Sequence, residues 1–297
     1  MFASRGTPVA PATLSPKLEV ISKLPSSPSD APPILFVHGA WHAAWCWDEF
    51  FLDYFAAHGY AAHAISLRAH GGSHSGIGLH RCRIRHYVED VAAVAAALPD
   101  PPILVGHSMG GFVVQKFLET HSAPAAFLLA SVPPNGARST YARLMRNRPV
   151  DVLRANATLS LWPFISDPDR AQRLLFSAAT SRDDIARYHR QLQDESMLGA
   201  LDCLALERVA ASQVRSPVHV MGAGNDAVVA DREIRATARA YGTAAVVFDN
   251  VAHDMMLDPN WRVVADSMIR KIDAQFRGSL SGPRPWAKPV KADVAPG

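Results

Sequence analysis

Residues 105–111 read VGHSMGG, which places Ser108 between two glycines, directly after the apolar run PPIL at 101–104. The segment from Gly106 to Gly110 fits the pattern G-x-S-x-G, in which a serine occupies a sharp, strained turn between a strand and a helix. The flanking glycines lack the Cβ atoms that would collide with neighbouring chain in such a turn. We therefore interpret Ser108 as a nucleophile rather than as part of an ordinary glycine turn.

The segments on both sides of this turn predict the fold. Short apolar runs bounded by breakers are typical of buried strands, and they occur at 17–24, 34–39, 60–66, 102–107, 126–132, 217–222 and 244–250. Segments with helical spacing separate most of these runs, at 47–57, 86–98, 109–120, 231–240 and 260–276. Because strand and helix alternate, the sequence predicts an α/β fold with a doubly wound, mostly parallel sheet.

One long interval interrupts this alternation. From Asn135 to Ser216 the chain shows short helical patterns and no convincing strand. Connections of this length are usually functional lids or separate modules. We predict a helical cap inserted into the α/β core, with flexible ends that are rich in Pro, Gly, Ser and Ala. The expected segments are a cap at 135–216, a core at 17–134 and 217–277, and ends at 1–16 and 278–297.

Composition and charge exclude several classes of protein. The 297 residues are 48% hydrophobic and 19% charged, as in a folded globular protein. The formal net charge is +3 and the basic residues are scattered apart from RCRIRH at 81–86, so no nucleic-acid partner is expected. The N-terminal residues carry one arginine with no apolar h-region after it, and no stretch reaches the length of a membrane span. We therefore expect a cytoplasmic protein without an integral membrane segment, with export by another route and the oligomeric state left open.

A serine nucleophile needs a base and an acid, and two later strand ends supply candidates. Asp226 follows the run at 217–222, and His253 follows the run at 244–250. The chain order Ser, Asp, His and the shared edge of the sheet predict a triad. The alternatives are a turn-forming Asp226 and a core His253. Two other carboxylates compete less well, because Asp249 ends a strand and Asp254 follows the histidine.

The oxyanion of an acyl-transfer intermediate needs N–H donors. The sequence HGAWHAAWCW at 38–47 follows a central strand. The backbone N–H of Ala40 is expected to converge there with that of Met109, the residue after the nucleophile. Gly39 permits the close approach, and His38 is expected to brace the loop by hydrogen bonding.

No metal or cofactor is predicted. Four histidines gather in an irregular Gly/Ser-rich region, at His70, His74, His80 and His86, but their spacing is not that of metal ligands such as HExxH. Neither a GxGxxG nor a Walker pattern occurs. The three cysteines, Cys46, Cys82 and Cys203, lie far apart and are expected to be reduced.

These motifs together resemble the α/β-hydrolase family over roughly residues 17–276. HGAWHAAWCW and GHSMGG resemble the plant methylesterase and hydroxynitrile lyase branch. SLRAHGGS at 66–73 is similar to the R-G-H-G-x-S stretch of bacterial esterases and monoglyceride-lipase-like enzymes, with Ala69 in place of the usual glycine. The resemblance implies the same roles for Ser108, Asp226 and His253, and the same oxyanion donors.

The departures from the lyase branch favour hydrolysis. In that branch a lysine near the catalytic histidine helps to handle cyanide, whereas here Asp254 follows His253 and no lysine is near. The lyases also carry a threonine in the HGA loop, where this chain keeps Gly39.

The expected activity is hydrolysis of carboxylic esters of small to medium hydrophobic substrates through an acyl-enzyme. Candidates for the pocket are Trp41, Leu161, Trp162 and Phe164, with Leu159, Leu175 and Phe176 as further roof residues, and for each roof residue packing within the cap is the alternative. Other chemistries remain open on this scaffold: lactonase, amidase, carbon–carbon hydrolase, haloperoxidase and hydroxynitrile lyase. A non-catalytic small-ligand receptor is also open, although it would not need all three triad members.

Overall fold

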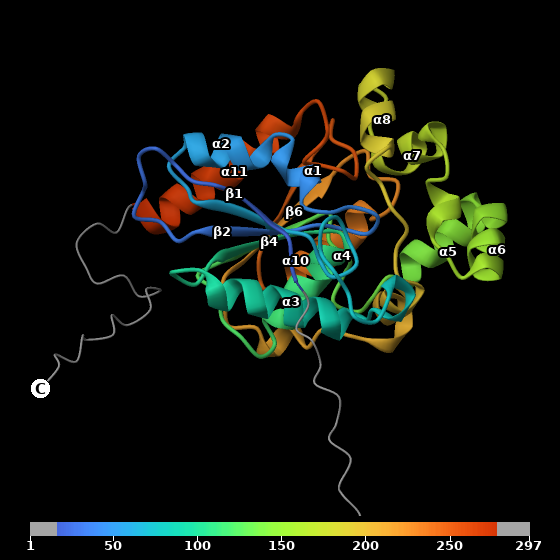
Figure 1. Ribbon diagram of the computed structural model, residues 1–297, viewed down its shortest axis with the longest axis horizontal. Helices are drawn as coiled ribbons and strands as arrows, with labels where there is room; N and C mark the ends of the chain where they lie inside the picture. The colour runs from blue at the N-terminus through green and yellow to red at the C-terminus, as the bar shows by residue number, and fades with distance from the viewer. Residues whose placement is uncertain (1–16, 278–297) are drawn as a thin grey trace, which may run out of the picture.

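A seven-stranded sheet, ordered β1-β3-β2-β4-β5-β6-β7, forms the centre of the computed structural model, which describes residues 17–277 (Figure 1). The strands are β1 (Val20–Lys23), β2 (Ile34–Val37), β3 (Ala62–Ile65), β4 (Ile103–His107), β5 (Ala126–Leu129), β6 (Val218–Ala223) and β7 (Ala245–Phe248). Only β1 pairs in an antiparallel sense, and the other pairs are parallel. The prediction of a mostly parallel α/β sheet is confirmed, and the flexible ends predicted at 1–16 and 278–297 lie outside the described residues.

Helices cover both faces of the sheet, which explains why its central strands are continuous apolar runs. One face packs against α1 (Trp45–Asp48), α2 (Phe51–Ala57) and α11 (Trp261–Ile272), and the other against α3 (Ile84–Ala97), α4 (Met109–Phe117) and α10 (Asp231–Ala240) (Figure 1). Alternate side chains of a strand enter different cores: Ile34 and Phe36 join the first, and Leu35 and Val37 join the second.

Two of the predicted helices are divided or change type in the structure. The segment expected at 47–57 forms two helices, because Phe50 leaves the helical conformation with φ −141° and ψ −45°. The segment expected at 260–276 ends its α-helix at Ile272 and continues as a π-helical turn at Asp273–Arg277.

Between β5 and β6 the described chain is helical. It contains α5 (Arg138–Asn147), α6 (Pro149–Thr158), α7 (Pro168–Leu175), α8 (Arg182–His189) and α9 (Met197–Leu201), which lie at one end of the sheet in Figure 1. Three of these helices begin at side-chain caps, where Asp167, Ser181 and Ser196 accept from backbone N–H groups of the first turn. These helices lie where the cap was expected, and the division into core and cap stays a prediction.

The strand register brings several loops to one edge of the sheet. Val37 of β2 lies beside Gly106 of β4, and Leu129 of β5 pairs with both His107 and Met221. The loops that follow β2, β4 and β6 therefore start at the same level, which is where ligands bind in open α/β sheets. Among residues 17–277, no helix is both long and apolar enough to span a membrane.

Candidate active site

Ser108 occupies a strained turn between β4 and α4. Its φ of 51° and ψ of −116° put a non-glycine residue at positive φ, a conformation that costs about 1–3 kcal/mol. The surrounding backbone holds it: the Ser108 N–H donates to the carbonyl of Leu129 at 3.0 Å, and the Ser108 carbonyl accepts from Val132 N–H at 3.1 Å. The turn therefore presents the serine side chain at the carboxyl edge of the sheet.

The glycines around Ser108 are there because other chain segments approach closely. A Cβ at Gly106 would lie 2.6 Å from the carbonyl oxygen of Gly110, and a Cβ at Gly110 would collide with the carbonyl of His38. A Cβ at Gly39 would lie 3.0 Å from the Cβ of Ser108. The loop after β2 is thus pressed against the serine, as the G-x-S-x-G pattern and Gly39 indicated.

The structure brings the three predicted triad residues together. The Ser108 hydroxyl lies 3.0 Å from Nε2 of His253, and Nδ1 of His253 lies 2.9 Å from Oδ2 of Asp226. The other carboxylate oxygen of Asp226 accepts from the N–H groups of Val228 and Val229 at 2.7 and 2.8 Å. Because a carboxylate only accepts, Nδ1 of His253 carries the proton and its Nε2 is free to accept from the serine.

The environment of His253 suits a base. Burial by itself lowers the pKa of a histidine, but the charge and hydrogen bond of Asp226 outweigh it, with a smaller contribution from Asp254, and the pKa of His253 is raised above its ordinary value. The competing Asp249 is exposed. Asp254 is buried, but it pairs with His42 and not with Nδ1 of His253.

The loop that carries Ala40 is held by His38. The N–H of Leu67 donates to Nε2 of His38 at 3.0 Å, so the proton sits on Nδ1, which donates to the carbonyl of Gly39 at 2.8 Å. Burial keeps the pKa of His38 well below its ordinary value, in agreement with a neutral ring. The carbonyl of Gly39 and the N–H of Ala40 belong to one planar peptide group, so fixing the carbonyl also fixes the direction of that N–H.

The second expected donor, Met109, is the first residue of α4. Backbone N–H groups in the first turn of a helix have no carbonyl partner within it. Its N–H is therefore available together with that of Ala40.

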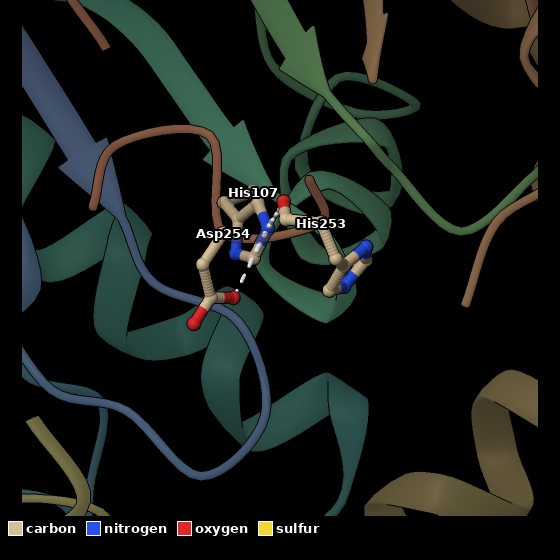
Figure 2. A group of neighbouring side chains, drawn as sticks. All are labelled: His107, His253 and Asp254. Atoms are coloured by element: carbon tan, nitrogen blue, oxygen red, sulfur yellow. Dashed lines mark hydrogen bonds and ion pairs between the residues drawn. The ribbon is translucent and has the colours of Figure 1, made fainter. Parts of the chain in front are cut away.

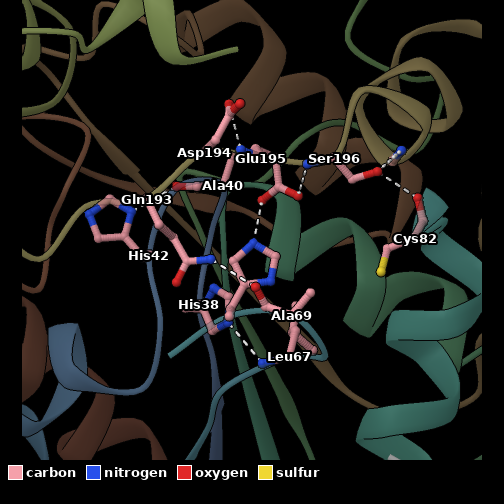
Figure 3. A network of polar contacts seen from close by, with 12 residues as sticks. His38, Ala40, His42, Leu67, Ala69, Cys82, Gln193, Asp194, Glu195 and Ser196 are labelled. Carbon is pink, nitrogen blue, oxygen red and sulfur yellow. Dashed lines mark hydrogen bonds and ion pairs between the residues drawn. The ribbon is translucent and has the colours of Figure 1, made fainter. Parts of the chain in front are cut away.

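Residues 193–196 contact both this loop and the loop after β3 (Figure 3). Gln193 donates from its backbone N–H to the carbonyl of Trp41 at 3.0 Å and from its side chain to the carbonyl of Ala69 at 2.9 Å. The fully buried Glu195 accepts from Nε2 of His70 at 3.1 Å. No sequence signal pointed to Gln193 or Glu195, because they lie more than 120 residues from these partners.

A largely apolar cavity of about 200 Å³ lies among the helices between β5 and β6. Three of the pocket candidates, Trp41, Leu161 and Phe164, line it. The other lining residues, which the sequence analysis missed, are Ala137, Thr140, Tyr141, Leu144, Val152, Ala155, Asn156, Met197, Ala200, Leu201 and Leu204. The three-residue spacing of Tyr141 and Leu144, which puts both on one face of a helix, was the sequence signal that could have identified them as lining residues.

The remaining pocket candidates lie elsewhere. Trp162 does not line this cavity, and its ring faces His189 with 5.7 Å between the ring centroids. Leu159 is 65% exposed, because it ends α6 in a left-handed conformation. Leu175 and Phe176 are buried in the core that covers the first face of the sheet.

Three side chains near Ser108 lie close enough to suggest a metal site: His107, His253 and Asp254 (Figure 2). Both ring nitrogens of His253 already face Ser108 and Asp226, and Nε2 of His107 donates to the carbonyl of His253 at 2.9 Å. The donors that remain are too few for zinc, which takes three or four protein ligands. The group fits hydrogen bonding better than metal coordination, and the absence of a metal stays a prediction.

Comparison with known families decides the classification. The family model of the Alpha/beta hydrolase family matches residues 34–266. The chain belongs to this family. The matched range contains the strands β2 to β7 and all five predicted triad and oxyanion residues, and the resemblance to α/β-hydrolases is confirmed.

The relatives of this alpha/beta hydrolase are distant. It is 34% identical over 134 residues to the probable esterase PIR7A of Oryza sativa subsp. indica, an alignment that covers 43% of this chain and 50% of that protein. The chain thus spans about half the length of the curated relatives it matches first. These esterase-named relatives and the family support a hydrolase.

Solved structures share the fold of this alpha/beta hydrolase. An esterase from Exiguobacterium antarcticum superposes with a TM-score of 0.71 at 15% identity and covers 87% of this chain and 96% of that one. An enol-lactonase from Burkholderia xenovorans LB400 has a TM-score of 0.63 at 16% identity, covering 85% and 94%. At such identities the likeness concerns the fold alone, and the chemistry must be argued from the site.

Proposed function

We propose that this alpha/beta hydrolase cleaves carboxylic esters through an acyl-enzyme on Ser108. The observation that carries the proposal is the hydrogen-bonded series from Ser108 through His253 to Asp226. Esterase-named relatives point in the same direction. A hydrophobic small-molecule ester is the proposed substrate, with no cofactor and no metal, and the cytoplasmic location stays a prediction.

The mechanism follows from the geometry. His253 removes the proton of Ser108 as Oγ attacks the ester carbonyl, and Asp226 stabilises the resulting imidazolium. The N–H groups of Ala40 and Met109 stabilise the oxyanion of the tetrahedral intermediate. His253 then gives its proton to the departing alcohol oxygen. Water, deprotonated by His253, attacks the acyl-enzyme and releases the acid, which restores Ser108.

The cavity favours hydrophobic acyl or alcohol groups of modest size. Trp41 lines it and directly follows the proposed oxyanion donor Ala40, and this link supports the cavity as the site of the acyl or alcohol group. Its lining is mostly aliphatic and aromatic, with Thr140 and Asn156 as polar members.

A lactonase is the second candidate, because a lactone is an internal ester and needs the same nucleophile, base and oxyanion donors. A fold neighbour with an enol-lactonase name makes it worth testing. Hydroxynitrile lyase chemistry is disfavoured, since the buried residue after His253 is Asp254 and not a cation.

The substrate class is tested with p-nitrophenyl esters of graded acyl length, assayed beside lactones and p-nitroanilides. We expect ester hydrolysis with a preference for short to medium chains and negligible anilide cleavage. Faster turnover of lactones than of every ester would favour the second candidate.

The Ala155→Phe variant tests the cavity as the acyl site. Ala155 is buried on α6 and lines the cavity, so a phenyl ring there fills it. We expect kcat/KM to fall about 10-fold or more for octanoate, with little change for acetate, since lost apolar contacts of this size are worth about 1–3 kcal/mol. Ala157→Phe, at an exposed position of the same helix, is the matched control.

If Ala155→Phe disturbs folding, Leu161→Ala provides the opposite change by enlarging the cavity, and it is expected to shift the preference towards longer acyl chains. An unchanged chain-length profile in folded variants would place the acyl group elsewhere.

The pH dependence of hydrolysis is expected to follow His253. This residue accepts the serine proton only when it is neutral, and Asp226 raises its pKa, so activity is present at high pH and is lost as the pH falls through that pKa. The midpoint of the acid limb should therefore lie above about 6.5, the ordinary value for histidine. Measurements of kcat/KM from pH 5 to 9 at constant ionic strength check this, and a midpoint near 5 would contradict it.

A further inference from the structure

Behind the proposed triad lies a group of three buried polar side chains that the mechanism does not use: His42, His107 and Asp254. We call it the Asp–His cluster. Their side chains are between 0% and 1% exposed. They come from three segments: His42 lies in the loop of the oxyanion donor Ala40, His107 is the last residue of β4 before the nucleophile, and Asp254 follows the base.

The contacts of the cluster link these three segments. One oxygen of Asp254 lies 3.0 Å from Nε2 of His42, and the other lies 3.9 Å from Nε2 of His107. His107 donates from this nitrogen to the carbonyl of His253 at 2.9 Å. Figure 2 shows His107 beside Asp254 while the ring of His253 points away from that carboxylate. At the other end of the cluster, Nδ1 of His42 lies 2.8 Å from the carbonyl of Ala40.

His42 lies between two oxygen acceptors. Both ring nitrogens face oxygens that can only accept, the carbonyl of Ala40 and the carboxylate of Asp254. A neutral imidazole with its proton on Nδ1 would donate to the carbonyl of Ala40 alone, whereas an imidazolium would also place a charge beside Asp254. The contact to Asp254 lies off the ideal hydrogen-bond direction, which makes it an ion pair more than an aligned hydrogen bond.

The other groups around Asp254 do not neutralise it. Burial lowers the pKa of His107 to about 3, so that ring is a neutral donor. Burial and the nearby carboxylate raise the pKa of the Cys46 thiol well above its ordinary value, so it too is neutral. Burial raises the pKa of Asp254, but His42 and the other histidines outweigh this and lower it. A buried carboxylate is costly without a cation, and His42 is the side chain within ion-pair distance of Asp254 that could supply one.

We propose that the Asp–His cluster is a positioning device that couples the oxyanion loop to the catalytic base. Asp254 keeps His42 charged, and His42 holds the carbonyl of Ala40 while His38 holds that of Gly39. The two peptide groups on either side of the Ala40 Cα are thereby clamped, which fixes the donor N–H. The negative charge of Asp254 also favours the imidazolium form of His253. This inference rests on the proposed ester hydrolysis.

Two isosteric or near-isosteric variants test the cluster, Asp254→Asn and His42→Asn, together with the double variant. The readouts are the rate of Ser108 phosphonylation by a fluorophosphonate between pH 5 and 9, and kcat and KM for a p-nitrophenyl ester. The exposed Asp249→Asn, in the loop after β7, is the matched control. The charged groups that face His253 are Asp226 and Asp254, and the ring of His107 beside it is neutral.

We expect Asp254→Asn to move the acid limb of phosphonylation to lower pH, because His253 loses a charge that favours its protonated form. His42→Asn should lower kcat about 10-fold or more with little change in KM, since a misaligned oxyanion donor weakens transition-state binding. The fold-decrease in kcat of the double variant should be smaller than the product of the two single fold-decreases, because no unpaired buried charge remains.

Nitrogen-15 NMR of histidine-labelled Ser108→Ala protein tests the charge state without activity. We expect both ring nitrogens of His42 to be protonated at pH 7, with the signal assigned by its loss in His42→Asn. A neutral His42 would overturn the inference. So would an acid limb that Asp254→Asn does not shift, if the decreases in kcat of the folded single variants also multiply in the double variant. If the wild type itself is not phosphonylated, it is the proposed ester hydrolysis that fails.

Discussion

Replacement of Ser108 by alanine is expected to lower kcat for ester hydrolysis by about 10⁵–10⁶-fold, because loss of a triad nucleophile removes the covalent step and leaves only the oxyanion donors and binding. The hydroxyl lies 3.0 Å from Nε2 of His253, and no other serine contacts that nitrogen among the described residues. The measurement is the rate of p-nitrophenyl butyrate hydrolysis, with mass spectrometry of a fluorophosphonate adduct that is present on Ser108 in the wild type and absent from the variant.

The exposed Ser139→Ala is the matched control and should keep full activity. Ser108→Ala should remain folded, because alanine and serine have similar strain at positive φ and the backbone bonds of the turn do not involve the side chain. A folded Ser108→Ala protein that retains more than a small fraction of the activity would contradict the nucleophile assignment. An unreactive serine in the folded wild type would instead favour the non-catalytic receptor.

The second large effect is expected for Asp226→Asn, at about 10⁴-fold in kcat. In this structure Oδ1 of Asp226 accepts from the N–H groups of Val228 and Val229. The amide oxygen of asparagine must take that place, which turns its NH₂ towards Nδ1 of His253. Nδ1 then has to accept, the proton moves to Nε2, and His253 presents a donor to Ser108 instead of a lone pair.

The wrong tautomer has a signature of its own. Activity in Asp226→Asn should recover partly at high pH or with a more reactive ester, while substrate affinity stays close to that of the wild type. Steady-state kinetics across pH, with Asp249→Asn as control, provide the measurement. A rise in KM with unchanged kcat would mean that Asp226 contributes to substrate binding and does not orient the base.

Much of the fold could be predicted from the sequence because its signals are local. Each of the seven apolar runs coincides with a strand, and the central strands, which are buried on both faces, need a continuous apolar segment wherever they lie. The break at Phe50 could not be predicted, because residues 47–57 keep a helical spacing through it. The strand order and register were also out of reach, since they depend on pairings between distant segments.

Some residues of the candidate site could also be predicted from local sequence, and others could not. Ser108, Asp226 and His253 each follow an apolar run, so their position at one edge of a parallel sheet could be inferred without contacts. Trp162 and Leu159 show the limit of such reasoning. Both are apolar and lie in the expected cap, yet one packs beside His189 and the other faces solvent, because side-chain direction in short helices and turns depends on tertiary packing.

The sequence by itself determined the doubly wound sheet, the strained serine turn and the order of the proposed nucleophile, acid and base, because glycine placement and apolar periodicity act over a few residues. Only the tertiary structure decided that Gln193 holds the oxyanion loop and that Asp254 pairs with His42 instead of competing with Asp226. Hydrogen bonds and ion pairs of this kind join residues far apart in the chain, and their partners are chosen by distance, direction and burial, which no local pattern records.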